Sequence, residues 1–333
     1  MRKKIKRGLV LCLAACMLSG GPVSCSHFEN TEIVLTTGLT ENQLFKVGNC
    51  VCTLPEAMIY VMDYQRQYES VYGVEMWEHD FGGITLEEYV KNIIVSQLAA
   101  MKAVTLLAKE YEVTLTEAET ETVKKAAKEY YSAMGSEAVK YMGLKLEDVE
   151  NLYYDHVLSR KVYQEITKDV NMEVSDDEAR IITVQQIRVD SKESAEDIQE
   201  KLAEGKEFMT LASAYSQDSQ ISYTFGRGEK DPVYEEAAFA LENEGVSDII
   251  EGEDGFYILK CVNNFDREAT EANKITMVER RRDEIFSGVY EELVANTPSE
   301  FNTKVWEQVH FEDWGEEIPE SFLEVYSRCF EEG

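Results

Sequence analysis

Residues 195–260 constrain the fold of this chain more than any other stretch, because several distinctive blocks follow one another in close order. Apolar side chains with amphipathic helical spacing come first, at positions 195, 198, 202, 208, 211 and 212. The blocks that follow are Tyr215-Ser216-Gln217-Asp218, Phe225-Gly226-Arg227-Gly228, Glu235-Glu236-Ala237-Ala238-Phe239 and Asp254-Gly255-Phe256-Tyr257-Ile258-Leu259-Lys260. A capping box of Ser175 and Glu178 precedes them, which predicts a domain boundary near residues 171–177.

Length and charge limit the classes of function. With 333 residues, 44% of them hydrophobic, the chain is long enough for two packed domains. Its 64 acidic and 33 basic side chains give a formal charge of -31, which repels nucleic acid phosphates and anionic lipid surfaces. The same charge favours cationic partners, or serves only to solvate the surface. No CxxC pair and no Cys/His cluster has metal-ligand spacing, so neither a metal nor another cofactor is expected.

The N-terminus has the three parts of an export signal. Basic residues lie within positions 2–7, an apolar core spans residues 9–18, and small residues precede a cysteine. Two cysteines fit the end of a bacterial lipoprotein signal. We favour Cys25, because cleavage before Cys16 leaves a very short apolar core; a signal cleaved without lipidation is a further alternative. Residues 1–25 are therefore assigned to the signal and lipobox, and residues 26–43 to a polar linker.

Residues 44–172 are predicted to form a mainly helical domain. A short strand is expected at residues 45–52, and a capping box of Thr53 and Glu56 then begins a helix. Further amphipathic helices are indicated by apolar side chains at positions 86, 90, 94, 98 and 101, at 123, 126, 127 and 130, and at 149, 152, 153, 157 and 166.

The last part of the chain, residues 268–333, is predicted to return to that helical domain. Helical spacing continues from Ala272 to Leu293, and such an amphipathic helix needs a packing partner. Residues 305–311 alternate like a short strand, and residues 322–330 have the spacing of a last helical turn or two.

Two groups of polar aromatic side chains in the helical domain allow two interpretations each. Tyr60, Tyr64, Tyr68 and Tyr72 lie along one helix face, where they either bind client polypeptides or pack against neighbouring helices. Packing is the commoner role of such a stripe. His156 shares a helical stripe with core residues, and we interpret it as a hydrogen-bonded histidine at the edge of the core and not as a ligand or a general base.

The blocks in residues 178–264 resemble a parvulin-type peptidyl-prolyl isomerase domain. The whole layout resembles foldases of the PrsA and SurA type, in which one parvulin domain is inserted into a helical domain. The resemblance implies an α+β fold: an all-helical chaperone-like domain built from both ends of the chain, with an inserted small antiparallel sheet surrounded by helices. It covers the third quarter of the chain through specific blocks and most of the rest through layout alone.

The resemblance implies a polar network built from three positions of the parvulin family, and this chain has the family's residue type at one of them. Asp218 stands at the family's Cys or Asp position. Gln186 and Tyr257 stand where the family has its two histidines. All four histidines of the chain, His27, His79, His156 and His310, lie outside residues 178–264. Gln186 and Tyr257 can still donate and accept hydrogen bonds, so a network with Asp218 does not require imidazole.

The resemblance also implies an apolar pocket for a proline ring. Phe239 is kept, Tyr234 matches the pocket phenylalanine, and Phe225 belongs to the adjoining loop. Lys230 stands at the position of the pocket methionine, where it either extends its amine past the rim or places a charge in the proline site.

Two main hypotheses and one alternative follow from these residues. The first is an extracytoplasmic foldase, anchored by lipid to the outer face of the bacterial cell membrane, that binds unfolded or extended exported polypeptides and isomerises X-Pro bonds. The missing histidines favour the second, a non-catalytic holdase that only binds peptide. The alternative is a surface interaction protein with no folding role.

Overall fold

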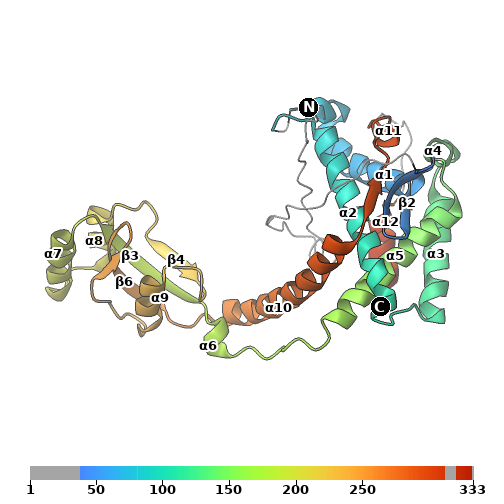
Figure 1. Cartoon of the computed structure of the whole chain (residues 1–333). Helices are drawn as coiled ribbons and strands as arrows, with labels where there is room; N and C mark the ends of the chain where they lie inside the picture. The colour runs from blue at the N-terminus through green and yellow to red at the C-terminus, as the bar shows by residue number, and fades with distance from the viewer. Residues whose placement is uncertain (1–37, 81, 312–319, 332–333) are drawn as a thin grey trace, which may run out of the picture. The chain divides into compact units, whose positions relative to one another are not determined.

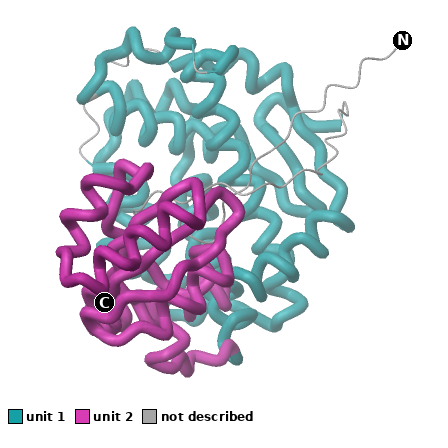
Figure 2. The backbone as a smooth tube through the Cα atoms, turned by 90° about the vertical axis from the view of Figure 1, so that its left-hand side faces the viewer, with its two compact units in different colours: residues 1–169, 283–333 teal, residues 170–282 magenta. Residues whose placement is uncertain are grey.

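The computed structural model describes residues 38–80, 82–311 and 320–331. The chain divides between Asp169 and Val170, and again between Arg282 and Asp283, into two compact units. Figure 2 shows unit 1 in teal and unit 2 in magenta. Unit 2 is one continuous insertion between the two parts of unit 1, and the predicted α+β class is confirmed. Both candidate lipidation cysteines, Cys16 and Cys25, and most of the predicted linker lie outside the described residues.

Helices make up most of unit 1 (Figure 1). They are α1 (Leu54–Tyr72), η1 (Val74–Glu78), α2 (Leu86–Glu110), α3 (Glu117–Ala133), α4 (Ser136–Met142), α5 (Leu146–Ile166), α11 (Thr303–Trp306), α12 (Phe322–Phe330) and the C-terminal part of α10 (Arg267–Asn296). The predicted capping box of α1 is confirmed: the Thr53 amide donates to Glu56 Oε2 at 2.6 Å, and the Glu56 amide donates to Thr53 Oγ1 at 3.3 Å. The backbone amides of Thr53 and Glu56, which have no carbonyl partner within the helix, are therefore hydrogen-bonded by side chains.

A three-stranded antiparallel sheet lies in unit 1, in the order β2-β1-β7. The single strand predicted at residues 45–52 is wrong, because the chain turns back between β1 (Gln43–Val47) and β2 (Cys50–Thr53). Gly48, at φ +57°, supplies the left-handed backbone that this turn requires. The third strand, β7 (Ser299–Phe301), pairs with β1, so these two distant segments lie side by side within unit 1.

The strand predicted at residues 305–311 is also wrong. Residues Thr303–Trp306 form the short helix α11, and the backbone amide of Val309 bonds to the carbonyl of Trp306. Trp306, Val309 and Phe311 are nevertheless all buried. Val309 and Phe311 follow α11 and are buried without pairing to a strand, so the alternation in the sequence reflects burial and not a pleated strand.

Helix α2 is apolar and long enough to cross a membrane by length and composition alone. Within unit 1, however, 67% of its apolar window is buried, and two of its buried side chains are lysines, Lys91 and Lys102. This arrangement fits a central core helix packed on all sides.

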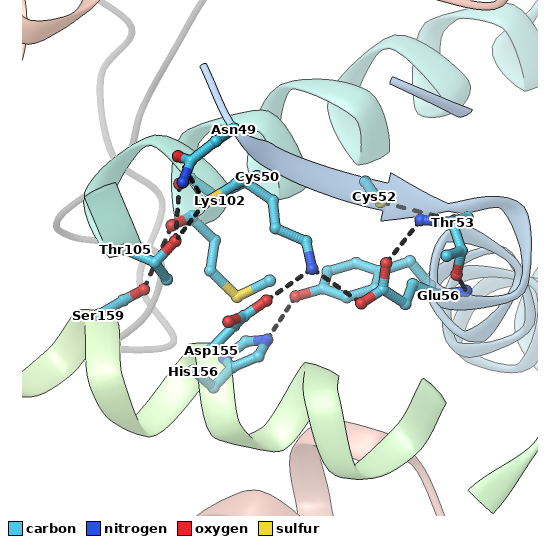
Figure 3. A network of polar contacts seen from close by, with 12 residues as sticks. Asn49, Cys50, Cys52, Thr53, Glu56, Lys102, Thr105, Asp155, His156 and Ser159 are labelled. Carbon is cyan, nitrogen blue, oxygen red and sulfur yellow. Dashed lines mark hydrogen bonds and ion pairs between the residues drawn. The ribbon is translucent and has the colours of Figure 1, made fainter. Parts of the chain in front are cut away.

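A buried ion cluster joins α2 to two other helices of unit 1 (Figure 3). The Lys102 amine donates to Glu56 of α1 at 2.8 Å and to Asp155 of α5 at 2.6 Å. The side chains of Lys102 and Glu56 are only 5% and 3% exposed. Burial lowers the pKa of Lys102, but the two carboxylates outweigh this and raise it overall, so the amine stays charged.

His156 lies beside this cluster and is hydrogen-bonded, as predicted. Its Nε2 lies 2.6 Å from the hydroxyl of Tyr60 on α1. Burial, together with the charge of Lys102, lowers the pKa of His156 to about 3, so the imidazole is neutral at ordinary pH. Of the tyrosine stripe, Tyr60 is buried and Tyr64 stacks on Tyr68 at 6.1 Å, whereas Tyr72 is 68% exposed.

Unit 2 contains a four-stranded antiparallel sheet in the order β4-β3-β6-β5. Its elements are α6 (Asp176–Ala179), β3 (Ile182–Val189), α7 (Lys192–Ala203), α8 (Phe208–Tyr215), β4 (Ser222–Phe225), α9 (Pro232–Phe239), β5 (Ile250–Gly252) and β6 (Gly255–Asn263). The helical stretch predicted between residues 195 and 212 is two helices, because Gly205, at φ +86°, ends the first one.

The sheet of unit 2 separates two small cores. Ile187, Val189 and Ile258 pack with α7 and α8 on one face. Ile182, Val184 and Leu259 pack with α9 on the other. Because side chains alternate along a strand, Gln186 of β3 lies on the α9 face, the same face as Tyr234.

The substitution Lys102→Met is expected to lower the free energy of unfolding of unit 1 by about 3–5 kcal/mol, because it leaves two buried carboxylates without their cation. Urea denaturation followed by tryptophan fluorescence measures this, since Trp77 and Trp306 are buried in unit 1 and the sequence of unit 2 contains no tryptophan. Lys124→Met, which removes an exposed ion pair with Glu121, is the matched control and should leave the midpoint unchanged. Equal midpoints for the two variants would contradict the role given to the cluster.

Candidate functional site

The candidate site lies on the α9 face of the unit 2 sheet, where β3 and β6 pair. Gln186 pairs with Leu259, and Arg188 pairs with Tyr257 across the two strands. Asp218 lies in the loop between α8 and β4, and the same loop bonds to β3 through the amide of Gln186, which donates to the carbonyl of Ile221. Strand pairing and this loop contact therefore bring together residues far apart in the sequence.

Three side chains form a continuous chain of hydrogen bonds. The hydroxyl of Tyr234 donates to Gln186 Oε1 at 2.8 Å, and Gln186 Nε2 donates to Asp218 Oδ2 at 2.5 Å. Gln186 is only 5% exposed, so both ends of its amide need partners. Two residues expected in the polar network, Gln186 and Asp218, are thus in direct contact.

Tyr257 is connected to this chain indirectly. Its hydroxyl donates to Asp254 Oδ1 at 2.5 Å, not to Asp218. Arg188 lies between the two carboxylates, with Nε 3.4 Å from Asp254 and Nη1 3.8 Å from Asp218. The polar network therefore runs from Tyr234 through Gln186, Asp218, Arg188 and Asp254 to Tyr257.

The aromatic residues expected in the pocket pack against one another. The ring centroids of Phe225 and Tyr234 are 5.9 Å apart, as are those of Phe225 and Phe239. Tyr257 meets Tyr234 edge to face at 5.5 Å. Phe225, Tyr234 and Phe239 are no more than 7% exposed, so these rings offer little surface to a ligand in this conformation.

Lys230 lies over the aromatic rings at the edge of this cluster. Its amine is 4.6 Å from the ring centroid of Tyr223 and 5.7 Å from that of Phe225. The residue is half-buried, so its stem covers apolar surface while the amine stays near solvent. A cation–π contact of this kind contributes about 0.5–1 kcal/mol, which a ligand can displace.

Burial and local charges keep the phenols of the site protonated. Burial, and next the hydrogen bond to Asp254, raises the pKa of Tyr257 to about 12. Burial likewise raises the pKa of Tyr234 and of Tyr223 above the ordinary value. Both tyrosines of the polar network therefore remain hydrogen-bond donors throughout the physiological pH range.

No imidazole lies in the described part of unit 2. His79, His156 and His310 belong to unit 1, and His27 lies outside the described residues. Among residues 38–80, 82–311 and 320–331, no group of three or more His, Cys, Asp or Glu side chains has metal-binding geometry. The chemical groups at the site are therefore hydrogen-bonding side chains, a carboxylate and largely buried aromatic rings.

Three contacts of the site went unassigned in the sequence analysis. Arg188 lies near the carboxylates of Asp218 and Asp254. Asp254 accepts a hydrogen bond from the Tyr257 hydroxyl. The amine of Lys230 lies over the ring of Tyr223. Arg188 could have been found, because it lies two residues after Gln186 on the same strand face. The partners of Asp254 and Lys230 depend on how a turn and a loop fold, and no local pattern specifies them.

Comparison with known proteins gives a consistent result for this region. The family profile of the PPIC-type PPIase domain, or rotamase, matches residues 175–263. Foldase protein PrsA of Caldanaerobacter subterraneus subsp. tengcongensis is 25% identical over 320 residues, which cover 87% of this chain and 94% of that protein.

Two further proteins extend the comparison. Foldase protein PrsA 1 of Listeria monocytogenes serovar 1/2a is 30% identical over 210 residues, which cover 56% of this chain and 68% of that protein. A similar solved structure is the crystal structure of a peptidylprolyl isomerase, PrsA, from Bacillus cereus. The two sequences are 19% identical, and the match covers 73% of this chain and 89% of that chain. Its TM-score is 0.37.

Tyr234→Phe is expected to destabilise unit 2 by about 1–3 kcal/mol, because the buried carbonyl of Gln186 loses its donor. Unit 2 contains no tryptophan, so hydrogen exchange of the β3 and β6 amides is the suitable measurement. Tyr215→Phe, at a residue that is 42% exposed, serves as control. The hydrogen-bonded chain has no structural importance if the two variants exchange at the same rate as the parent.

Proposed function

The chain belongs to the PrsA family of foldases, and on that premise we propose that it assists the folding of exported polypeptides outside the cytoplasm. Its partners are unfolded or extended chains, including segments with X-Pro bonds. Unit 2 is the part that acts on the X-Pro bond, as a parvulin-type isomerase of low activity.

The hydrogen-bonded chain of Tyr234, Gln186 and Asp218 is the observation that supports isomerase activity. An X-Pro bond isomerises in tens of seconds unaided, because amide resonance sets a barrier near 20 kcal/mol. A catalyst needs no proton transfer for this step. It needs polar groups fixed in a water-poor site that favour the twisted amide over the planar forms. The buried amide of Gln186, oriented by Tyr234 and Asp218, meets that requirement without histidine.

One observation favours a second candidate function, a holdase that binds peptide without isomerising it. The rings of Phe225, Tyr234 and Phe239 are almost completely buried, and Lys230 covers part of the same aromatic surface. A proline ring reaches this surface only after the lysine moves. As a holdase, unit 2 binds extended peptide at the edge of this aromatic cluster and does not isomerise it.

Location outside the cytoplasm is supported by the N-terminal sequence. Its basic residues, apolar core and cysteine are those of an export signal. Lipidation of Cys25, with Cys16 as the alternative, anchors the protein to the outer face of the cell membrane.

Asp218→Ala in the full chain is expected to lower kcat/KM for an X-Pro peptide about tenfold, since it removes the acceptor that orients Gln186 and one such hydrogen bond contributes about 1–1.5 kcal/mol. A protease-coupled proline-peptide assay measures the rate. Asp197→Ala, which removes an exposed carboxylate paired with Lys201, is the control and should retain the parent rate. A parent rate equal to that in buffer, with aggregation of an unfolded client still suppressed, establishes the holdase instead.

Lipidation is tested by expressing the chain in a bacterium fed a labelled fatty acid. The label is expected on the parent and on Cys16→Ala, and its loss is expected in Cys25→Ala, because only the correct cysteine provides the thiol that carries the lipid. A label that follows Cys16, or none on the parent, contradicts the assignment.

A further inference from the structure

The C-terminal helix α12 lies on a set of aromatic side chains in unit 1, here called the aromatic platform. The platform consists of Tyr60 on α1, Tyr130 on α3, and Tyr153 and His156 on α5. Phe322 of α12 stacks on Tyr153 with ring centroids 4.1 Å apart, and lies 5.8 Å from Tyr130 and 5.2 Å from His156. The side chain of Phe322 is completely buried by these contacts.

The apolar side of α12 has the spacing of a helix bound in an apolar site. Phe322, Val325, Tyr326 and Phe330 recur at three- and four-residue intervals, and the first three are no more than 5% exposed. Leu323, on the opposite side, is 48% exposed. One face of α12 is therefore buried in unit 1, and its Phe322 and Tyr326 rings contact the platform.

Three side chains of unit 1 bond to the main chain of α12, beside the side-chain ion pairs of Arg66 with Glu324 and of Arg328 with Glu129. Phe322 N donates to both carboxylate oxygens of Asp63, at 3.2 and 3.0 Å. The hydroxyl of Tyr153 donates to the carbonyl of Phe322 at 3.0 Å, and Arg160 donates to the carbonyl of Phe330 at 2.9 Å. Main-chain groups are the same in every polypeptide, so these three residues can hold the two ends of a helix whatever its sequence.

One polar atom of the platform has no partner. The hydroxyl of Tyr130 is buried without a hydrogen bond, although its ring lies against Phe322. An unsatisfied buried hydroxyl costs about 1–3 kcal/mol, so α12 does not complete the platform's hydrogen bonds. A segment with a polar side chain near this position can do so.

We propose that the aromatic platform, with Asp63 and Arg160 at its two ends, binds amphipathic helical segments of client polypeptides, and that α12 occupies it as a tethered competitor. The inference rests on the proposed foldase function and identifies the client chemistry: aromatic or aliphatic side chains at positions i, i+3, i+4 and i+8 of a short helix. A tethered segment competes at an effective concentration of roughly mM, so it weakens client binding without abolishing it.

The test uses the full chain and a fluorescein-labelled peptide with the sequence of residues 320–331. Phe322→Ala removes the side chain that anchors α12, and Leu323→Ala removes an exposed side chain of the same helix. Fluorescence anisotropy should show at least tenfold tighter peptide binding to Phe322→Ala than to the parent, with Leu323→Ala equal to the parent. A scrambled peptide of the same composition should not bind.

Hydrogen exchange shows where the peptide binds. Saturating peptide should speed exchange of the α12 amides in the parent chain, because the helix is displaced. The proposal is overturned by equal peptide affinity of the three proteins, or by unchanged α12 exchange. It is also overturned if Phe322→Ala no longer unfolds cooperatively, since α12 is then an integral part of the core.

Failure of this inference is distinguishable from failure of the foldase role. Peptide binding requires neither isomerase activity nor a folding client. If Phe322→Ala binds the peptide but neither protein suppresses aggregation of an unfolded client, the platform is a peptide site and the foldase proposal fails. If the parent suppresses aggregation and all three proteins bind the peptide equally, only the platform proposal fails.

Discussion

The buried charge of Lys102 is the interaction on which unit 1 depends. A lysine amine in a water-poor interior is tolerated only with close anionic partners, and Glu56 and Asp155 provide them from two different helices. The three helices α1, α2 and α5 are thereby fixed in one relative position. Tyr60 and His156, which belong to two of these helices, then meet at 2.6 Å and form part of the platform beneath α12.

The candidate site of unit 2 is built on a sheet and does not depend on a buried ion cluster. The pairing of β3 with β6 brings Gln186, Arg188 and Tyr257 to one area, and the loop before β4 adds Asp218. The histidine positions of the parvulin family are filled by an amide and a phenol that are already engaged within the network. Both ends of the Gln186 amide are hydrogen-bonded within this network, whereas Arg188 Nε is buried without a hydrogen-bond partner.

Much of the fold could be predicted, and the failures have physical causes. The helices of unit 1 and the capping box at Thr53 depend on local patterns, and they are present. The prediction of one strand at residues 45–52 overlooked the left-handed turn at Gly48. Alternation at residues 305–311 was mistaken for a strand, because Val309 and Phe311 are buried after the short helix α11 without pairing to a strand.

The sequence by itself determined the family, the α+β class and the helices of unit 1. Local spacing and capping are enough for these, because they depend on residues close together in the chain. Only the tertiary structure decided that Tyr257 bonds to Asp254, that Lys230 covers an aromatic ring, and that α12 lies on Tyr153. Each of these contacts depends on where separate elements pack, and no local pattern records that.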